Sequence, residues 1–127
     1  MFETILLPID QSREAFETAS KAIQIAKSHE SNIIMLSVAK PEPTEMNDDE
    51  SISSLLKRAR KQIEEAGINC EVLEKEGKPA FVICDVADDL NVDLIVMGTR
   101  GVNLEEDAES TAARVIQLAP CPVLVVP

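Results

Sequence analysis

Two of the chain's four glycines, Gly98 and Gly101, lie in one short segment whose residue types could bind a phosphate. The segment follows the apolar run 94–97 and precedes a stretch with helical periodicity. Glycine has no Cβ, so a ligand can approach its backbone N–H, and a helix behind the loop adds unpaired donors and a favourable dipole. The pattern predicts a phosphate-binding loop that includes Met97, with Arg100 as the nearest cation.

Four acidic residues follow this loop and oppose that chemistry: Glu105, Glu106, Asp107 and Glu109. A like charge 4 Å from a phosphate costs on the order of 4 kcal/mol at an effective dielectric of about 20, before water and salt reduce it. Three interpretations are open. The acids form a solvated first helical turn, which the helix dipole favours, or they hold Mg²⁺ that bridges to nucleotide phosphates, or they dock a basic partner.

Asp10 is a further candidate because it directly follows the first apolar run, 4–9. A carboxylate at a strand end can accept hydrogen bonds from sugar hydroxyls or an exocyclic amine, or it can cap the turn into the next helix. A catalytic arrangement is not readable, since His29, the only histidine, falls at a predicted helix end. The three cysteines have no CxxC spacing, which argues against a zinc site or a disulfide framework, and we expect them to be buried.

Composition excludes several functional classes. The formal net charge of −11 argues against nucleic acid and against a membrane surface, and the absence of Trp and Tyr leaves few platforms for base stacking. No apolar run approaches the roughly 18 residues of a membrane span, and the first residues lack the pattern of a signal peptide. We therefore expect a cytoplasmic protein. The length predicts one domain over residues 1–127 with an aliphatic core. Because no catalytic arrangement is readable, we expect no enzymatic activity.

Strand-like and helix-like periods alternate along the chain. Strands are expected over 4–9, 32–38, 68–74, 94–97 and 123–126, and helices over about 12–29, 51–66, 79–90 and 108–118. This order indicates an α/β fold with a parallel, doubly wound sheet that helices cover on both faces. Ligands of such sheets bind beyond the carboxyl ends of the strands. Residues 8–10, Val38 and residues 98–101 should therefore converge on one crevice.

Three motifs resemble those of the universal stress protein family, in the same order and over essentially the whole chain. Residues 8–12, PIDQS, resemble its first-strand signature, residues 93–101, DLIVMGTRG, its nucleotide loop, and residues 119–126, APCPVLVV, its last strand. The resemblance implies a five-stranded sheet of order 3-2-1-4-5 and usually a homodimer. It also implies that Asp10 and the backbone near Val38 line the adenine and ribose part of a nucleotide site.

The last strand supplies a physical reason for a homodimer. Val123, Leu124, Val125 and Val126 would form an apolar strand at one edge of the sheet. An uncovered edge of this kind tends to pair with another chain, and a two-fold dimer would close it. We therefore expect a homodimer joined at this strand.

The chain departs from the family in the phosphate half of the site. Nucleotide-binding members read Gly, two residues, Gly, nine residues, Gly, then Ser or Thr. Aligned backwards from residues 120–122, the third glycine falls on Glu109 and the hydroxyl on Ser110, with seven residues after Gly101 instead of nine. The base and sugar half, with Pro8, Asp10, Val38 and Gly98, keeps the pattern.

Two functional hypotheses follow from this departure. The first is a cytoplasmic homodimer in stress response that lacks tight ATP binding because Glu109 replaces the third glycine. The alternative is a sensor that binds AMP or ATP in the same crevice, with or without Mg²⁺. Hydrolysis of ATP is disfavoured because no base or phosphate-binding lysine is evident.

Overall fold

The computed structural model describes residues 2–9, 15–39, 49–98 and 106–127. Strands and helices alternate along the chain, as predicted. They are β1 (Thr4–Pro8), α1 (Ala15–His29), β2 (Asn32–Ala39), α2 (Asp49–Glu65), β3 (Cys70–Glu76), α3 (Pro79–Asp89), β4 (Leu94–Gly98), α4 (Glu106–Leu118) and β5 (Val123–Val126).

The boundaries of β3 differ from the expected ones at both ends, because the strand begins at Cys70 and not at residue 68, and ends at Glu76 and not at residue 74. Ile68 is buried, and its N–H donates to Ile63 O at the end of α2, so it belongs to the turn after that helix. Gly67 precedes it with φ +82°, a left-handed conformation that confirms the predicted helix stop.

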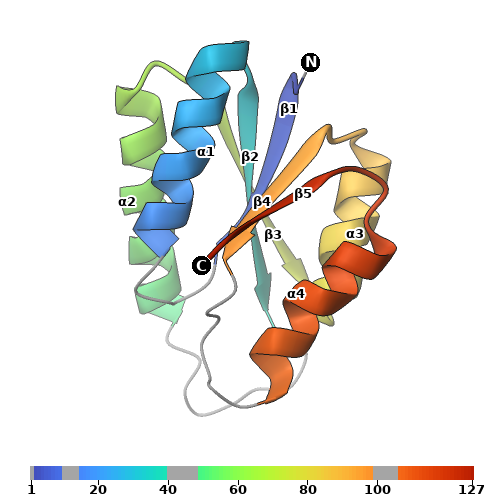
Figure 1. The fold of residues 1–127 in the computed structure, drawn as a ribbon. Helices are drawn as coiled ribbons and strands as arrows, with labels where there is room; N and C mark the ends of the chain where they lie inside the picture. Colours follow the sequence, from blue (N-terminus) through green and yellow to red (C-terminus); the bar gives the residue numbers. More distant parts are fainter. Residues whose placement is uncertain (1, 10–14, 40–48, 99–105) are drawn as a thin grey trace.

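The five strands form one parallel sheet in the order β3-β2-β1-β4-β5, which confirms the predicted fold class. Helices α1 and α2 cover one face of the sheet, and α3 and α4 cover the other (Figure 1). The direction of strand addition reverses between β1 and β4. That reversal is the topological switch point at which α/β sheets bind ligands.

Alternate residues of each central strand feed two separate cores. Ile5 and Leu7 of β1 pack toward α1 and α2, whereas Leu6 packs toward α3 and α4. All three are fully buried. On the first face α1 contributes small residues, Ala19 and Ala22 among them, so its backbone can approach the sheet closely.

The cysteines differ from the expectation that all three are buried. Cys84 is buried, but Cys70 and Cys121 are only partly so, and all three are free thiols. Burial raises the pKa of each thiol, to about 11 for Cys70. Raised pKa values disfavour the reactive thiolate, so these cysteines act as packing groups. Among the described residues, no helix is both long and apolar enough to span a membrane.

Candidate functional site

The structure describes four of the eight predicted site residues in full: Pro8, Val38, Met97 and Gly98. They lie at the carboxyl ends of β1, β2 and β4, the edge at which sequence reasoning placed the crevice. Asp10, Arg100 and Gly101 lie outside the described residues. Ser110 lies in α4, and its side chain is likewise outside the description. The described part therefore corresponds to the predicted base and sugar half.

The pairing of β1 with β4 stops before these strands end. The last registered pair joins Leu6 to Ile95, although β1 continues to Pro8 and β4 to Gly98. On its other side β1 stays paired with β2 as far as Pro8 and Leu36. On the carboxyl side of the switch point, β1 and β4 are therefore neighbours that are no longer paired by ladder hydrogen bonds.

Pro8 explains why the ladder ends there. In a central strand the backbone groups of successive residues alternate between the two neighbouring strands. The Thr4 N–H donates to Asp93 Oδ2, at 2.9 Å, on the β4 side, and the Ile9 N–H donates to Leu36 O, at 2.8 Å, on the β2 side. Residue 8 has the same parity as residue 4, so it faces β4. Pro8 has no N–H to donate in that direction.

Apolar, partly exposed side chains lie around the unpaired carboxyl ends of β1 and β4. Pro8, Ile9 and Val38 are each half-buried, Ile9 on the α1 and α2 face and Val38 on the α3 and α4 face. Surfaces of this kind suit the flat ring of a base, which needs apolar contact and a few backbone partners. Met97 differs, because its side chain is buried in the α3 and α4 core, so only its backbone could contact a ligand.

Gly98 is a glycine for a reason that the sequence did not indicate. Its φ lies outside the left-handed region, so backbone freedom is not the cause. A Cβ at this position would stand 3.3 Å from Oγ1 of Thr18 and 3.8 Å from Val126 O. The missing side chain therefore makes room for α1 against the end of β4.

Sequence reasoning missed Thr18, which is 3% exposed in α1. A signal was present, because Thr18 is a polar residue among the alanines of the buried helix face, Ala15, Ala19 and Ala22. The alanines on this helix face indicate that Thr18 is buried. They do not indicate that its hydroxyl lies beside Gly98, eighty residues later in the chain.

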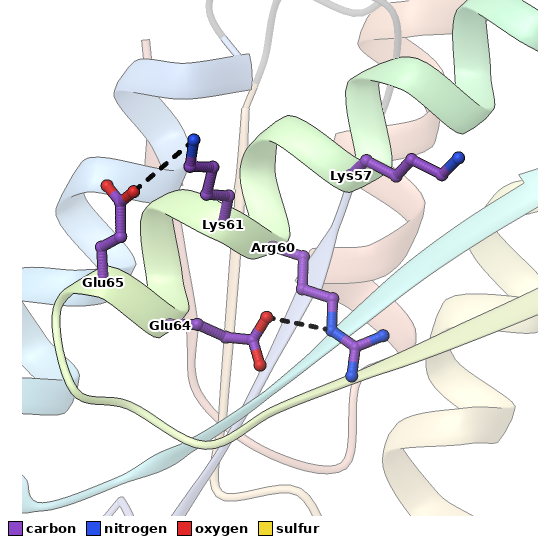
Figure 2. Close-up of a pocket in the computed structure, with 5 residues that line it drawn as sticks. All are labelled: Lys57, Arg60, Lys61, Glu64 and Glu65. Carbon is purple, nitrogen blue, oxygen red and sulfur yellow. Dashed lines mark ion pairs between the residues drawn. The ribbon is translucent and has the colours of Figure 1, made fainter.

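A concave surface of about 510 Å³ lies on α2 and has a charged lining (Figure 2). A single helix supplies all its lining residues: Lys57, Arg60, Lys61, Glu64 and Glu65. Arg60 pairs with Glu64 at 3.3 Å and Lys61 with Glu65 at 3.9 Å, and the two pairs point to different sides of the helix. Two of the three cations are paired with acids of the same helix, and the pairs diverge, which is typical of a solvated helix face.

The described residues offer little for catalysis or metal binding. They contain no group of three or more His, Cys, Asp or Glu side chains that could hold a metal ion. His29, in the last turn of α1, packs edge-on against the ring of Phe2, with centroids 5.3 Å apart. This contact lies at the amino end of the sheet, opposite the crevice.

Comparisons with known proteins agree with this geometry. The sequence profile of the universal stress protein family matches residues 1–127. The universal stress protein Sll1654 of Synechocystis sp. is 46% identical over 136 residues, which cover 100% of this chain and 87% of that protein. The solved structure of the universal stress protein UspA from Lactobacillus plantarum is 27% identical, with a TM-score of 0.74 and coverage of 99% and 98%.

Two more distant structures share the fold and carry ligands. A universal stress protein in complex with cAMP is 24% identical with a TM-score of 0.79, covering 98% of this chain and 97% of its own. The protein from Archaeoglobus fulgidus in complex with dAMP is 22% identical with a TM-score of 0.79, covering 100% of both chains. At these identities the likeness shows the fold alone. The family profile and the Synechocystis relative establish that the chain belongs to the universal stress protein family.

Proposed function

We propose that this universal stress protein is a cytoplasmic homodimer in stress response whose crevice takes adenosine or AMP and does not bind ATP tightly. The observation that carries the proposal is the unpaired carboxyl end of β1 and β4, where Pro8 and Gly98 border an apolar, partly exposed opening. Such an opening at the switch point suits a base and a sugar.

The preference for few phosphates comes from the sequence beyond the described residues. Glu109 stands where nucleotide-binding members have the third glycine, and three more acids precede it. Each phosphate added to a nucleotide increases the repulsion from these carboxylates. The cAMP and dAMP complexes of the two distant neighbours, both monophosphates, are in keeping with this preference. We assign no catalytic step to the protein.

Isothermal calorimetry with adenosine, AMP, cAMP and ATP, each with and without Mg²⁺, tests the ligand. We expect AMP to bind at least about tenfold more tightly than ATP, since one like-charge contact amounts to more than 1.4 kcal/mol. Glu109→Gly should raise ATP affinity and leave adenosine affinity unchanged. Submicromolar ATP binding by the wild-type protein would overturn the proposal, and a gain in ATP affinity only with Mg²⁺ would favour the cation-assisted sensor.

The surface of β5 supports the homodimer. Leu124 is 39% exposed on this edge strand. All the large hydrophobic side chains that are exposed among the described residues belong to the α3, α4 and β5 side of the molecule: Phe81, Leu90, Ile116, Leu118 and Leu124. The opposite edge, β3, carries exposed charges instead, Glu71 and Glu74 among them, which discourage pairing.

Sedimentation of a Leu124→Lys variant tests the dimer. A buried lysine at the centre of a paired edge should shift the protein from dimer to monomer at micromolar concentration. Leu90→Lys is a matched control, because Leu90 is equally exposed but lies at the end of α3, outside β5. A wild-type protein that sediments as a monomer would reject the homodimer and leave the ligand proposal standing.

A further inference from the structure

We infer that Thr18 is a positioning residue of the crevice, because its side chain occupies the space beside Gly98 and so fixes α1 against the end of β4. The inference rests on the proposed nucleotide function. Its role is to set the start of α1 and the end of β4 relative to each other.

The geometry leaves little room for a side chain at position 98. A Cβ on Gly98 would lie 3.3 Å from Thr18 Oγ1, tighter than nine in ten real Cβ contacts, so Thr18 would have to move by a few tenths of an ångström. Thr18 is 3% exposed and sits on the helix face that packs on the sheet, so it cannot turn into solvent. A residue other than glycine at 98 would therefore push α1 away from β4 or force Thr18 out of its rotamer.

The contact matters because β1 gives the end of β4 no support. Pairing between the two strands ends at Leu6 and Ile95, so Gly98 is held on one side only, by its pairing with Val126 of β5. Thr18 supplies the support from the α1 face. The packing of Thr18 thus helps to fix the point at which the chain leaves β4. The backbone of β4 at this point has no ladder partner in β1.

A double-mutant cycle in the whole chain tests this role, with AMP affinity and thermal midpoint as readouts. Gly98→Ala should lower AMP affinity about tenfold and the melting temperature by roughly 3–6 °C. Thr18→Ala alone should cost about threefold in affinity, and Thr18→Ser, which keeps the hydroxyl, should bind as the wild type does. In the Thr18→Ala background Gly98→Ala should cost nothing further, because the new methyl group fills the vacated space.

Gly67→Ala separates positioning from plain destabilisation. Gly67 has φ +82° and no neighbour within 4 Å of its Cβ position, so alanine there strains the backbone far from the crevice. It should lower the melting temperature and leave AMP affinity unchanged. If Gly98→Ala behaves in the same way, or costs the same affinity with and without Thr18, the positioning role is wrong. A wild-type protein that binds no nucleotide overturns the proposed function, and the positioning role with it.

Discussion

At the amino ends of β1 and β4 hydrogen bonds join the two segments directly, whereas at their carboxyl ends the two strands are no longer paired, and Gly98 is held by its pairing with Val126 of β5 and by packing against Thr18. Thr4 and Asp93 form a reciprocal pair at the amino end: the Thr4 N–H donates to Asp93 Oδ2 and the Asp93 N–H donates to Thr4 O, both at 2.9 Å. Asn32 adds a third link, because its N–H donates to Glu3 O at 2.8 Å.

The difference indicates that the amino end of the sheet contributes to stability and that the carboxyl end is the part available for a ligand. The hydrogen bonds at the strand starts stabilise the amino end and occupy backbone groups of Glu3, Thr4 and Asp93 there. At the carboxyl end Pro8 has no N–H to pair with β4, and Gly98 has no side chain to fill the space beside it. Substitutions at the amino end should therefore change stability, and substitutions at the carboxyl end should change binding.

Asp93→Ala should give the largest loss of stability. It removes a partly buried, charged acceptor and leaves the Thr4 N–H without its partner, at a cost of about 1.5–3 kcal/mol. Urea denaturation measures the loss, and Asp89→Ala, an exposed acid at the end of α3, is the control. Equal effects of the two substitutions would mean that the link between Thr4 and Asp93 contributes nothing, and a change in AMP affinity would contradict the division between the two ends.

Ser31→Ala should have a smaller effect, about 1 kcal/mol. Ser31 is 5% exposed and its hydroxyl donates to Phe2 O, which holds Phe2 in a left-handed conformation with φ 58°. The control is Ser28→Ala, since the Ser28 hydroxyl also donates to a backbone carbonyl, Gln24 O, but on the exposed surface. Thermal denaturation should separate the two variants, and a Ser28→Ala effect as large as that of Ser31→Ala would refute the importance of burial.

Cys70, at the start of β3, gives the amino end a pH dependence. Burial is the main cause that raises the pKa of its thiol from the ordinary 9.0 to about 11. The folded state therefore holds this proton more tightly than the unfolded state, so the stabilisation is complete below pH 9 and is lost as the pH rises toward 11. Unfolding midpoints at pH 8 and pH 10.5 should differ less in Cys70→Ala than in the wild type, and an equal difference in the two proteins would contradict this role of Cys70.

The sequence predicted the sheet well because its signals are local. Continuous apolar runs such as 94–97 indicate buried parallel strands, and Gly67 indicates a helix stop, from a few residues each. The resemblance to the family supplied the strand order, which the structure confirms. Pro8, Val38 and Gly98 were therefore placed at the correct edge.

The contacts that build the two ends were not predictable in the same way. Thr4 and Asp93 are 89 residues apart in sequence, and their hydrogen bond exists only because β1 and β4 are neighbours. The contact of Thr18 with Gly98 likewise depends on where α1 crosses the sheet. Asp10, Arg100, Gly101 and Glu109 are named by motif alone, and their roles stay predictions.

Pro8→Ala should change stability least and yet affect the crevice. The new N–H faces β4 and can extend its ladder, a gain of about 0.5–1.5 kcal/mol, while the lost proline frees the unfolded chain by about 0.4–1 kcal/mol, so the two nearly cancel. Pairing beyond Leu6 and Ile95 would close the opening, and AMP affinity should fall by about tenfold. Hydrogen exchange at residue 8 and calorimetry measure the two effects. Pro79→Ala, at the first turn of α3, loses a proline without touching β1, so it should leave AMP binding unchanged. Unchanged AMP binding in Pro8→Ala, with a protected new N–H, would show that the unpaired ladder is not what admits the ligand.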